Sequence, residues 1–187
     1  VIKATIDLCS DLEGSVLVHG SPKQRIIPSD KSAYEAKQRA LDIWYSAGSY
    51  AQERGVTYCI EPLARNETSF INTLEEAMSI VNTINSPGLK TMIDTSAAGL
   101  AEAEPVADLI RKWAPSGNVA HVQLNSTNRG APGDGDDPFN DIFTALKEVN
   151  YDGVFAIEPF IYKDGGDATA KRAINYVKGI LENIGHP

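Results

Sequence analysis

The chain has 187 residues, of which 42% are hydrophobic and 22% are charged, and its formal net charge at pH 7 is −8. This apolar content is too high for a disordered chain and is enough for the core of one folded domain, which we predict to span residues 1–187. The negative charge disfavours nucleic acid and anionic membrane surfaces as partners, because both are bound through clustered Lys and Arg. No apolar run reaches the roughly 20 residues that cross a bilayer, so we expect no membrane partner and a cytoplasmic location.

Helices and strands are predicted to alternate along the chain. Predicted helices, in chain order, cover residues 1–12, 31–54, 73 to just before 86, 102–113, 138–149 and 167–184. Predicted strands cover residues 15–19, 58–60, 91–93, 121–123 and 155–157. Thr73 and Glu76 have the spacing of a capping box, which marks the start of the third helix. The alternation indicates an α/β fold with five parallel strands, each followed by a helix.

A polar residue stands at the end of four of these predicted strands. They are Glu61, Asp94, Gln123 and Glu158, at intervals of 33, 29 and 35 residues. Each interval is the length of one βα unit. Because the carboxyl ends of parallel strands converge on the mouth of a β/α barrel, we expect these four side chains to lie around one point. This pattern is the main indication of function in the sequence.

Five βα units are fewer than a complete barrel contains. An eight-stranded TIM barrel needs about 250 residues, and this chain begins without an initiator Met. We therefore expect a partial TIM barrel, its C-terminal portion, with about three N-terminal units missing; a fragment, a processed product and a true partial barrel all remain open. The two open edges of such a sheet favour pairing with another chain, so a homo-oligomer is expected.

The three carboxylates predict a metal site. Like charges held close together are costly unless a cation neutralises them. Oxygen ligands suit Mn²⁺, Mg²⁺ or Co²⁺, with Mn²⁺ the first choice, and Gln123 would supply a neutral fourth oxygen beside Glu61, Asp94 and Glu158. The alternative is that each acid merely caps the loop or helix that follows it. Three acids at matching positions of successive units favour the metal site.

Four short segments follow one another along the chain: EPLARNE at 61–67, IDT at 93–95, NRGAPGDG at 128–135 and IEPF at 157–160. In this order they resemble segments of the xylose-isomerase-like sugar isomerases and epimerases, and most of all of the ketose 3-epimerases of the tagatose and psicose type. The resemblance implies that Glu61 and Glu158 are metal ligands and also the catalytic acid/base pair, whereas Asp94 is a ligand only. It further implies that Glu67 contacts a substrate hydroxyl and that Arg129 binds a distal hydroxyl or a phosphate.

Such a pair suits epimerisation. A carboxylate can remove the proton next to a carbonyl, a cation stabilises the resulting enediolate, and a second carboxylate can return a proton to the opposite face. Two positions depart from the family pattern: Gln123 stands where the family has a metal-binding His, and Ala97 stands where it has a substrate-contacting His. His121 shares the strand parity of Gln123 and is a candidate substrate contact, or else an ordinary buried, hydrogen-bonded His.

The loop after the first strand offers a separate hint. Lys23 and Arg25 lie where substrate loops of a barrel lie and are candidates for binding a phosphate or carboxylate, with solvated charges as the alternative. His19, at the end of the strand, is a candidate for lining the pocket.

We therefore expect a metal-dependent isomerase or epimerase of a small sugar, ketose or polyol. The alternatives are a related inosose dehydratase-like lyase and a non-catalytic sugar-binding or inactive barrel fragment. A metal-dependent endonuclease of the same superfamily is disfavoured, because the chain has only three His and a net negative charge.

Overall fold

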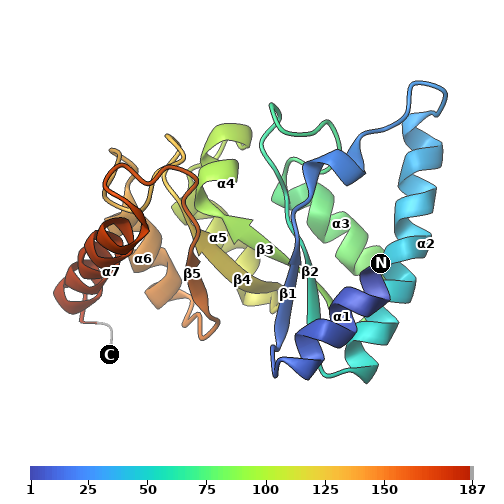
Figure 1. The fold of residues 1–187 in the computed structure, drawn as a ribbon, viewed down its shortest axis with the longest axis horizontal. Coiled ribbons are helices and arrows are strands. Elements are labelled where there is room, and N and C mark those ends of the chain that lie inside the picture. The colour runs from blue at the N-terminus through green and yellow to red at the C-terminus, as the bar shows by residue number, and fades with distance from the viewer. Residues whose placement is uncertain (186–187) are drawn as a thin grey trace.

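The computed structural model describes residues 1–185, and these form one open parallel sheet with helices packed against it (Figure 1). The strands pair in chain order, each parallel to the next. They are β1 (Val16–His19), β2 (Thr57–Ile60), β3 (Leu89–Asp94), β4 (Val119–Leu124) and β5 (Phe155–Ile157). The sheet curls into a half-barrel, which confirms the predicted partial TIM barrel and all five predicted strands. The last two residues of the predicted domain, 186–187, lie outside the described part.

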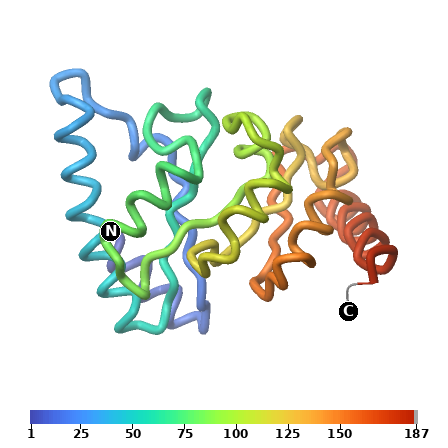
Figure 2. The backbone as a smooth tube through the Cα atoms, turned by 180° about the vertical axis from the view of Figure 1, so that it is seen from behind, coloured from blue at the N-terminus to red at the C-terminus, as the bar shows by residue number. Residues whose placement is uncertain are grey.

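The helices flank the sheet in the same order as the strands (Figure 2). They are α1 (Ile2–Asp11), α2 (Ala33–Glu53), α3 (Leu74–Ile84), α4 (Thr95–Ala101), α5 (Val106–Trp113), α6 (Phe139–Glu148) and α7 (Gly166–Asn183), with short 3-10 helices η1 (Pro22–Arg25) and η2 (Ala114–Ser116). The predicted helix ends agree with these to within one or two residues, except near residue 100. None of the helices within residues 1–185 is both long and apolar enough to span a membrane.

One predicted helix was wrong in its extent. The sequence predicts a single helix over 102–113, whereas the structure has α4 at Thr95–Ala101 and a separate α5 from Val106. Asp94 caps the start of α4 by accepting a hydrogen bond from the Ala97 N–H at 2.7 Å. Glu102 and Pro105 are extended, so the helix stops and restarts. The predicted capping box of Thr73 and Glu76, by contrast, is confirmed.

Two apolar clusters hold the helices to the sheet. The first joins β3 and β4 to α5 and α6 and includes Val122 and Leu124 of β4. The second joins β1, β2 and β3 to α1, α2 and α3. Because successive residues of a strand point to opposite faces, His121 and Gln123 lie on the face of β4 away from these helices. The inner face of the half-barrel therefore carries the polar side chains that the sequence analysis singled out.

Candidate functional site

The four predicted ligands all lie at the carboxyl edge of the sheet. Glu61 follows β2 directly, Asp94 is the last residue of β3, Gln123 lies next to the end of β4, and Glu158 follows β5 directly. Strand pairing places Asp94 opposite Gln123. The charges of Asp94 and Glu158 both raise the pKa of Glu61, so the three carboxylates lie within electrostatic reach of one another. The edge of the sheet thus brings the predicted residues into one neighbourhood.

Glu61 is the most strongly perturbed acid of this group. The residue is 7% exposed. Burial first, and then the charges of Asp94 and Glu158, raise the pKa of Glu61 to about 8, although the nearby Arg25 opposes them. Without a cation beside it, Glu61 is therefore largely protonated at pH 7. A carboxyl group with a pKa close to neutral is suited to donate and accept a proton.

Asp94 is held in place from both of its oxygens. Its Oδ1 accepts the Ala97 N–H at 2.7 Å, and its Oδ2 accepts a hydrogen bond from Asn125 Nδ2 at 2.5 Å. Burial raises the pKa of Asp94 to about 6, and these two hydrogen bonds counteract the rise. Asp94 is therefore a helix cap, as the alternative interpretation of the sequence expected, and its carboxylate is also held in a fixed position within the candidate site.

Asn125 is the functional residue that sequence reasoning missed. Its side chain donates to Asp94, while its Oδ1 accepts the backbone N–H of Glu158 at 2.9 Å. Its backbone is fixed in turn by Thr95, whose hydroxyl accepts the Asn125 N–H at 2.9 Å and donates to the Asn125 carbonyl at 2.7 Å. One amide thus ties the ends of β3, β4 and β5 together. In the sequence, only its position two residues after Gln123, just past the end of β4, would have indicated that Asn125 lies near the site.

Gln123 and His121 are buried on the inner face and incompletely hydrogen-bonded. Gln123 is 7% exposed and its Oε1 has no partner within residues 1–185, and the same is true of His121 Nδ1. Burial lowers the pKa of His121, and a hydrogen bond with the backbone of Val154 opposes this shift. A buried oxygen or nitrogen without a partner loses its hydration, which normally costs 1–3 kcal/mol. These two atoms are therefore the best candidates for contact with a bound ion, water or substrate.

Glu67 and Arg129, the predicted substrate contacts, are paired with each other. Arg129 Nη1 lies 2.9 Å from Glu67 Oε1, and the guanidinium lies 4.1 Å from the centroid of the Phe160 ring. Burial raises the pKa of Glu158, and Arg129 acts against this rise. Arg129 therefore links the loop after β2 to the loop after β5 beside the carboxylates. Half-buried ion pairs of this kind can exchange one partner for a substrate hydroxyl.

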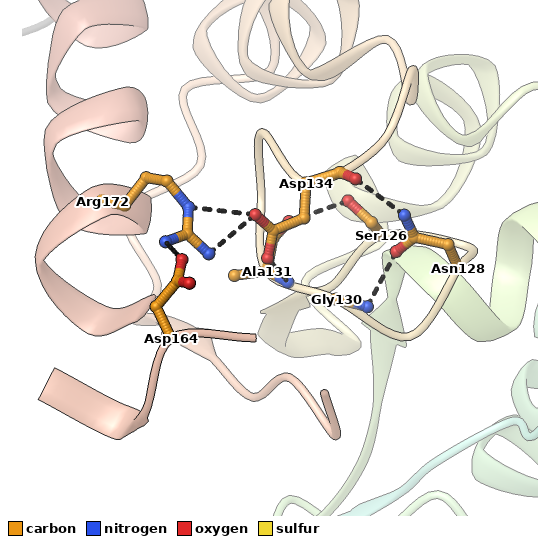
Figure 3. Close-up of polar contacts among 7 residues, drawn as sticks. All are labelled: Ser126, Asn128, Gly130, Ala131, Asp134, Asp164 and Arg172. Atoms are coloured by element: carbon orange, nitrogen blue, oxygen red, sulfur yellow. Dashed lines mark hydrogen bonds and ion pairs between the residues drawn. The ribbon is translucent and has the colours of Figure 1, made fainter. Parts of the chain in front are cut away.

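The loop that carries Arg129 is fastened by a polar network around Asp134 (Figure 3). Arg172 of α7 donates to Asp134 Oδ1 through Nε at 3.0 Å and Nη2 at 2.9 Å, while Asp134 Oδ2 accepts the Ala131 N–H at 3.1 Å. Asn128 closes the loop by donating to the Asp134 carbonyl at 2.8 Å. Arg129 itself has a left-handed backbone, with φ 68°. The loop is thus rigidly shaped, which presents Arg129 at a fixed place.

The loop after β1 differs from its prediction. Arg25 was expected to bind an anion or to be solvated, yet it is 5% exposed and donates to the backbone carbonyls of His19 and Glu61. Lys23 is exposed. The His19 ring packs edge-on against Trp44 and Tyr58 and its Nδ1 lies 2.7 Å from the Tyr58 hydroxyl. The main chain of His19 therefore lies next to Glu61, whereas its ring packs among aromatic side chains of the helix-covered face.

A large cavity also lies apart from the strand-end site. It has a volume of about 630 Å³ and lies between α1, α2 and the open edge of β1. Its walls include Leu17, His19, Ile43, Trp44 and Phe70, and none of the seven predicted site residues lines it. The carboxylates and the unpartnered atoms, rather than the cavity, therefore define the candidate site.

The four predicted ligands offer oxygen atoms that suit a hard divalent cation, but their side chains are not close enough together to hold one in this conformation. Carboxylate and amide oxygens are the ligands that Mn²⁺ and Mg²⁺ prefer, and the unpartnered Oε1 of Gln123 is such an oxygen. Within residues 1–185, however, no three His, Cys, Asp or Glu side chains lie close enough together to hold a metal ion. A cation would therefore have to draw Glu61 and Glu158 toward the fixed Asp94.

The family model described as the xylose isomerase-like TIM barrel matches residues 1–180 of this chain. The chain belongs to that family. This match confirms the resemblance found in the sequence motifs.

Relatives of known sequence in this xylose isomerase-like family include two D-psicose 3-epimerases. That of Enterocloster bolteae is 35% identical over 144 residues, which cover 77% of this chain and 46% of the relative. That of Agrobacterium fabrum is 32% identical over 139 residues, covering 74% of this chain and 46% of the relative. The aligned part is therefore less than half the length of these relatives.

Solved structures show the same barrel fold. A D-psicose 3-epimerase with D-tagatose from Clostridium cellulolyticum H10 superposes with a TM-score of 0.82 at 23% identity, covering 96% of this chain and 69% of the other. An L-ribulose 3-epimerase superposes with a TM-score of 0.84 at 22% identity, covering 97% of this chain and 66% of the other. The present chain thus corresponds to about two thirds of these barrels.

Proposed function

We propose that this protein is a divalent-metal-dependent isomerase or epimerase of a small sugar, ketose or polyol. The observation that carries the proposal is the set of strand-end residues: three mutually coupled carboxylates and a buried amide oxygen without a partner. Membership of the xylose isomerase-like family and the relatives named as D-psicose 3-epimerases support it.

Glu61, Asp94, Gln123 and Glu158 would hold the cation. When bound, a divalent cation supplies positive charge beside the oxygens of the substrate and so favours loss of a proton from the adjacent carbon. Mn²⁺ is the first choice and Mg²⁺ or Co²⁺ the next, because all four donors are oxygens. The unpartnered Oε1 of Gln123 would gain a partner on binding.

Glu61 and Glu158 would carry the proton. In the direction written here, ionised Glu158 removes the proton from the carbon next to the substrate carbonyl, and the electron pair moves to the carbonyl oxygen. Protonated Glu61 then returns a proton to the opposite face of the same carbon, which inverts its configuration. The two carboxyl groups end with their protonation states exchanged.

Substrate hydroxyls would be bound by Glu67, Arg129 and His121. Glu67 and Arg129 form a pair beside Glu158, and His121 presents an unpartnered Nδ1 on the inner face. Donors and acceptors of this kind match a polyhydroxylated chain, in which each hydroxyl both donates and accepts. A membrane or a nucleic acid is not among the proposed partners, and a homo-oligomer stays a prediction.

Exchange of solvent deuterium tests this proposal directly. The protein, loaded with Mn²⁺, is incubated in D₂O with D-psicose, D-tagatose and L-ribulose in turn, and proton NMR follows deuterium at each carbon. We expect deuterium at one carbon together with its epimer, and neither with Glu158→Gln. Loss of water from the substrate would instead indicate the lyase alternative. Absence of exchange with folded, metal-loaded protein would contradict the proposal.

A second candidate is a sugar-binding protein without turnover. It is favoured by the lack, within residues 1–185, of three acidic, His or Cys side chains grouped to hold a metal, and by Gln123 in the position of a metal-binding His. Saturable binding of a ketose without exchange in the same experiment would support this candidate.

A further inference from the structure

Glu61 lies against a residue that has no side chain. A Cβ atom placed on Gly20 would be 1.7 Å from Glu61 Oε2 and 2.8 Å from Glu61 Cδ. Gly20 is not one of the glycines with a positive φ, so its backbone does not itself require glycine. The carboxyl group of Glu61 therefore occupies the space that any other side chain at position 20 would fill.

The main chain of Glu61 is held by a second residue of the same loop. Arg25 is the last residue of the 3-10 helix η1 (Pro22–Arg25), which follows β1 in the chain. Arg25 Nη1 donates to the Glu61 carbonyl at 2.5 Å, and Arg25 Nη2 donates to the His19 carbonyl. The His19 carbonyl also accepts the Glu61 N–H at 3.3 Å. Arg25 thus bridges the carbonyl ends of β1 and β2 next to the last backbone hydrogen bond between them.

Arg25 is buried, so its hydrogen bonds to the carbonyls of His19 and Glu61 are part of the protein interior and not a solvent-exposed contact. Arg25 is 5% exposed, and within residues 1–185 it forms no ion pair with any carboxylate. A buried guanidinium is costly unless its N–H groups are satisfied. Its two terminal nitrogens donate to the carbonyls at the strand ends, whereas its buried Nε has no partner within residues 1–185, so Arg25 depends on these two carbonyls for its hydrogen bonds.

We propose that Gly20 and Arg25 are positioning residues for Glu61, Gly20 by leaving room for its carboxyl group and Arg25 by fixing its main chain. This proposal rests on the proposed role of Glu61 as acid/base and ligand, but its geometry is independent of that role. Gly20 lies against the Glu61 carboxyl group but has no side chain that could react, and Arg25 binds the main-chain carbonyl of Glu61.

The test begins with Gly20→Ala. The atom that the new methyl meets is the end of a flexible side chain, so we expect the fold to persist and the Glu61 carboxyl group to turn away. A crystal structure of the metal-free variant should show Glu61 in a different rotamer with the backbone at position 20 unmoved. Gly166→Ala is the matched control, because a Cβ there meets no atom within 4 Å. An unmoved Glu61 beside a shifted residue 20 would overturn the proposal, whether or not the protein is an epimerase.

Mn²⁺ affinity provides the coupled measurement. Gly20→Ala should weaken Mn²⁺ binding roughly tenfold in the wild-type background and have little effect in the Glu61→Asp background, since the shorter side chain withdraws from residue 20. Equal weakening in both backgrounds would overturn the proposal. If no protein in the series binds Mn²⁺, the proposed function fails, and the crystal structures still decide the role of Gly20.

Arg25 is tested by Arg25→Met and Arg25→Lys. Arg25→Met loses both hydrogen bonds, whereas Arg25→Lys retains the charge and one donor. We expect kcat to fall at least tenfold in Arg25→Met with KM nearly unchanged, and to recover in part in Arg25→Lys. A rise in KM with kcat unchanged would mean that Arg25 binds substrate, which would overturn its assignment as a positioning residue. Circular dichroism of each variant confirms that it is folded.

Discussion

Asn125 donates a hydrogen bond of 2.5 Å from its side-chain nitrogen to Oδ2 of Asp94. The same side chain accepts the backbone N–H of Glu158, so a single amide sets the relative positions of two carboxylates that come from different strands. An amide is suited to this task because its oxygen accepts and its nitrogen donates, whereas a carboxylate can only accept.

The first prediction concerns this amide. Asn125→Ala should lower the free energy of unfolding by about 1–3 kcal/mol, because it leaves buried polar groups without partners. It should also weaken Mn²⁺ binding about tenfold, since Asp94 loses one of its two restraints. Urea unfolding and calorimetry measure the two effects. Asn140→Ala, at an exposed position of α6, is the control. Unchanged Mn²⁺ affinity in Asn125→Ala would contradict the assigned role.

The second prediction concerns the pH dependence of stability. The pKa of Glu61 is 4.5 in an ordinary environment and about 8 in the folded protein, so between these values the folded state binds more protons than the unfolded state. The free energy of unfolding must then fall as pH rises through this window. From pH 6 to pH 8 the fall due to Glu61 is about 2 kcal/mol, because one pKa unit is worth about 1.4 kcal/mol and Glu61 is already about half ionised at pH 8.

Urea unfolding of the metal-free protein at pH 6 and pH 8 measures this fall. Glu61→Gln should remove most of it, because the amide does not titrate. Added Mn²⁺ should also reduce it if the cation binds at Glu61, since an ionised carboxylate is then stabilised. The same decrease in Glu61→Gln as in the wild type would show that another group is responsible.

The third prediction concerns the pair of Glu67 and Arg129. Arg129→Ala should raise KM for the substrate about tenfold or more, because a charge-assisted hydrogen bond is worth about 1.5–3 kcal/mol. Its effect on stability should be small, since the pair is only partly buried. Arg65→Ala is the matched control, as Arg65 is an exposed residue of the same loop as Glu67. Equal effects of the two substitutions on KM would remove Arg129 from the substrate site.

The fourth prediction concerns the loop network around Asp134. Arg172→Met removes both donors to Asp134 Oδ1 and should loosen residues 126–135, which hydrogen exchange would detect as faster exchange of the Ala131 N–H. Because Arg172 lies on α7 and outside the candidate site, we expect Mn²⁺ affinity to be retained while KM rises through disorder of Arg129. Unchanged exchange of the Ala131 N–H in Arg172→Met would show that hydrogen bonds within the loop stabilise it without Arg172, which would contradict this prediction.

The strands and most helices could be predicted because their signals are local. Short apolar runs ending in a polar residue identified the strands, and Thr73 and Glu76 identified the start of α3. The helix α4 was not predicted, because the Asp94 that caps it is also the last residue of strand β3, with no loop between the two elements. A single residue here serves two elements, which a pattern for either element alone does not indicate.

The positions of Asn125 and Arg25 could not be predicted, because their partners are distant in sequence. Asn125 binds residues 31 and 33 positions away, and Arg25 binds a carbonyl 36 positions away. A cationic residue in a polar loop is typically solvated, and only the folded chain shows that Arg25 is buried against the carbonyls of His19 and Glu61. The acids of the site, by contrast, were found because each follows a strand of recognisable pattern.

The most direct test of the account is a calorimetric titration of the metal-stripped protein with Mn²⁺, repeated on Gln123→Ala and on the exposed control Gln38→Ala. The account predicts saturable binding of one Mn²⁺ per chain, weakened at least tenfold by Gln123→Ala and unaffected by Gln38→Ala. Absence of binding to the folded protein, or equal affinity in Gln123→Ala, would contradict the proposed metal site.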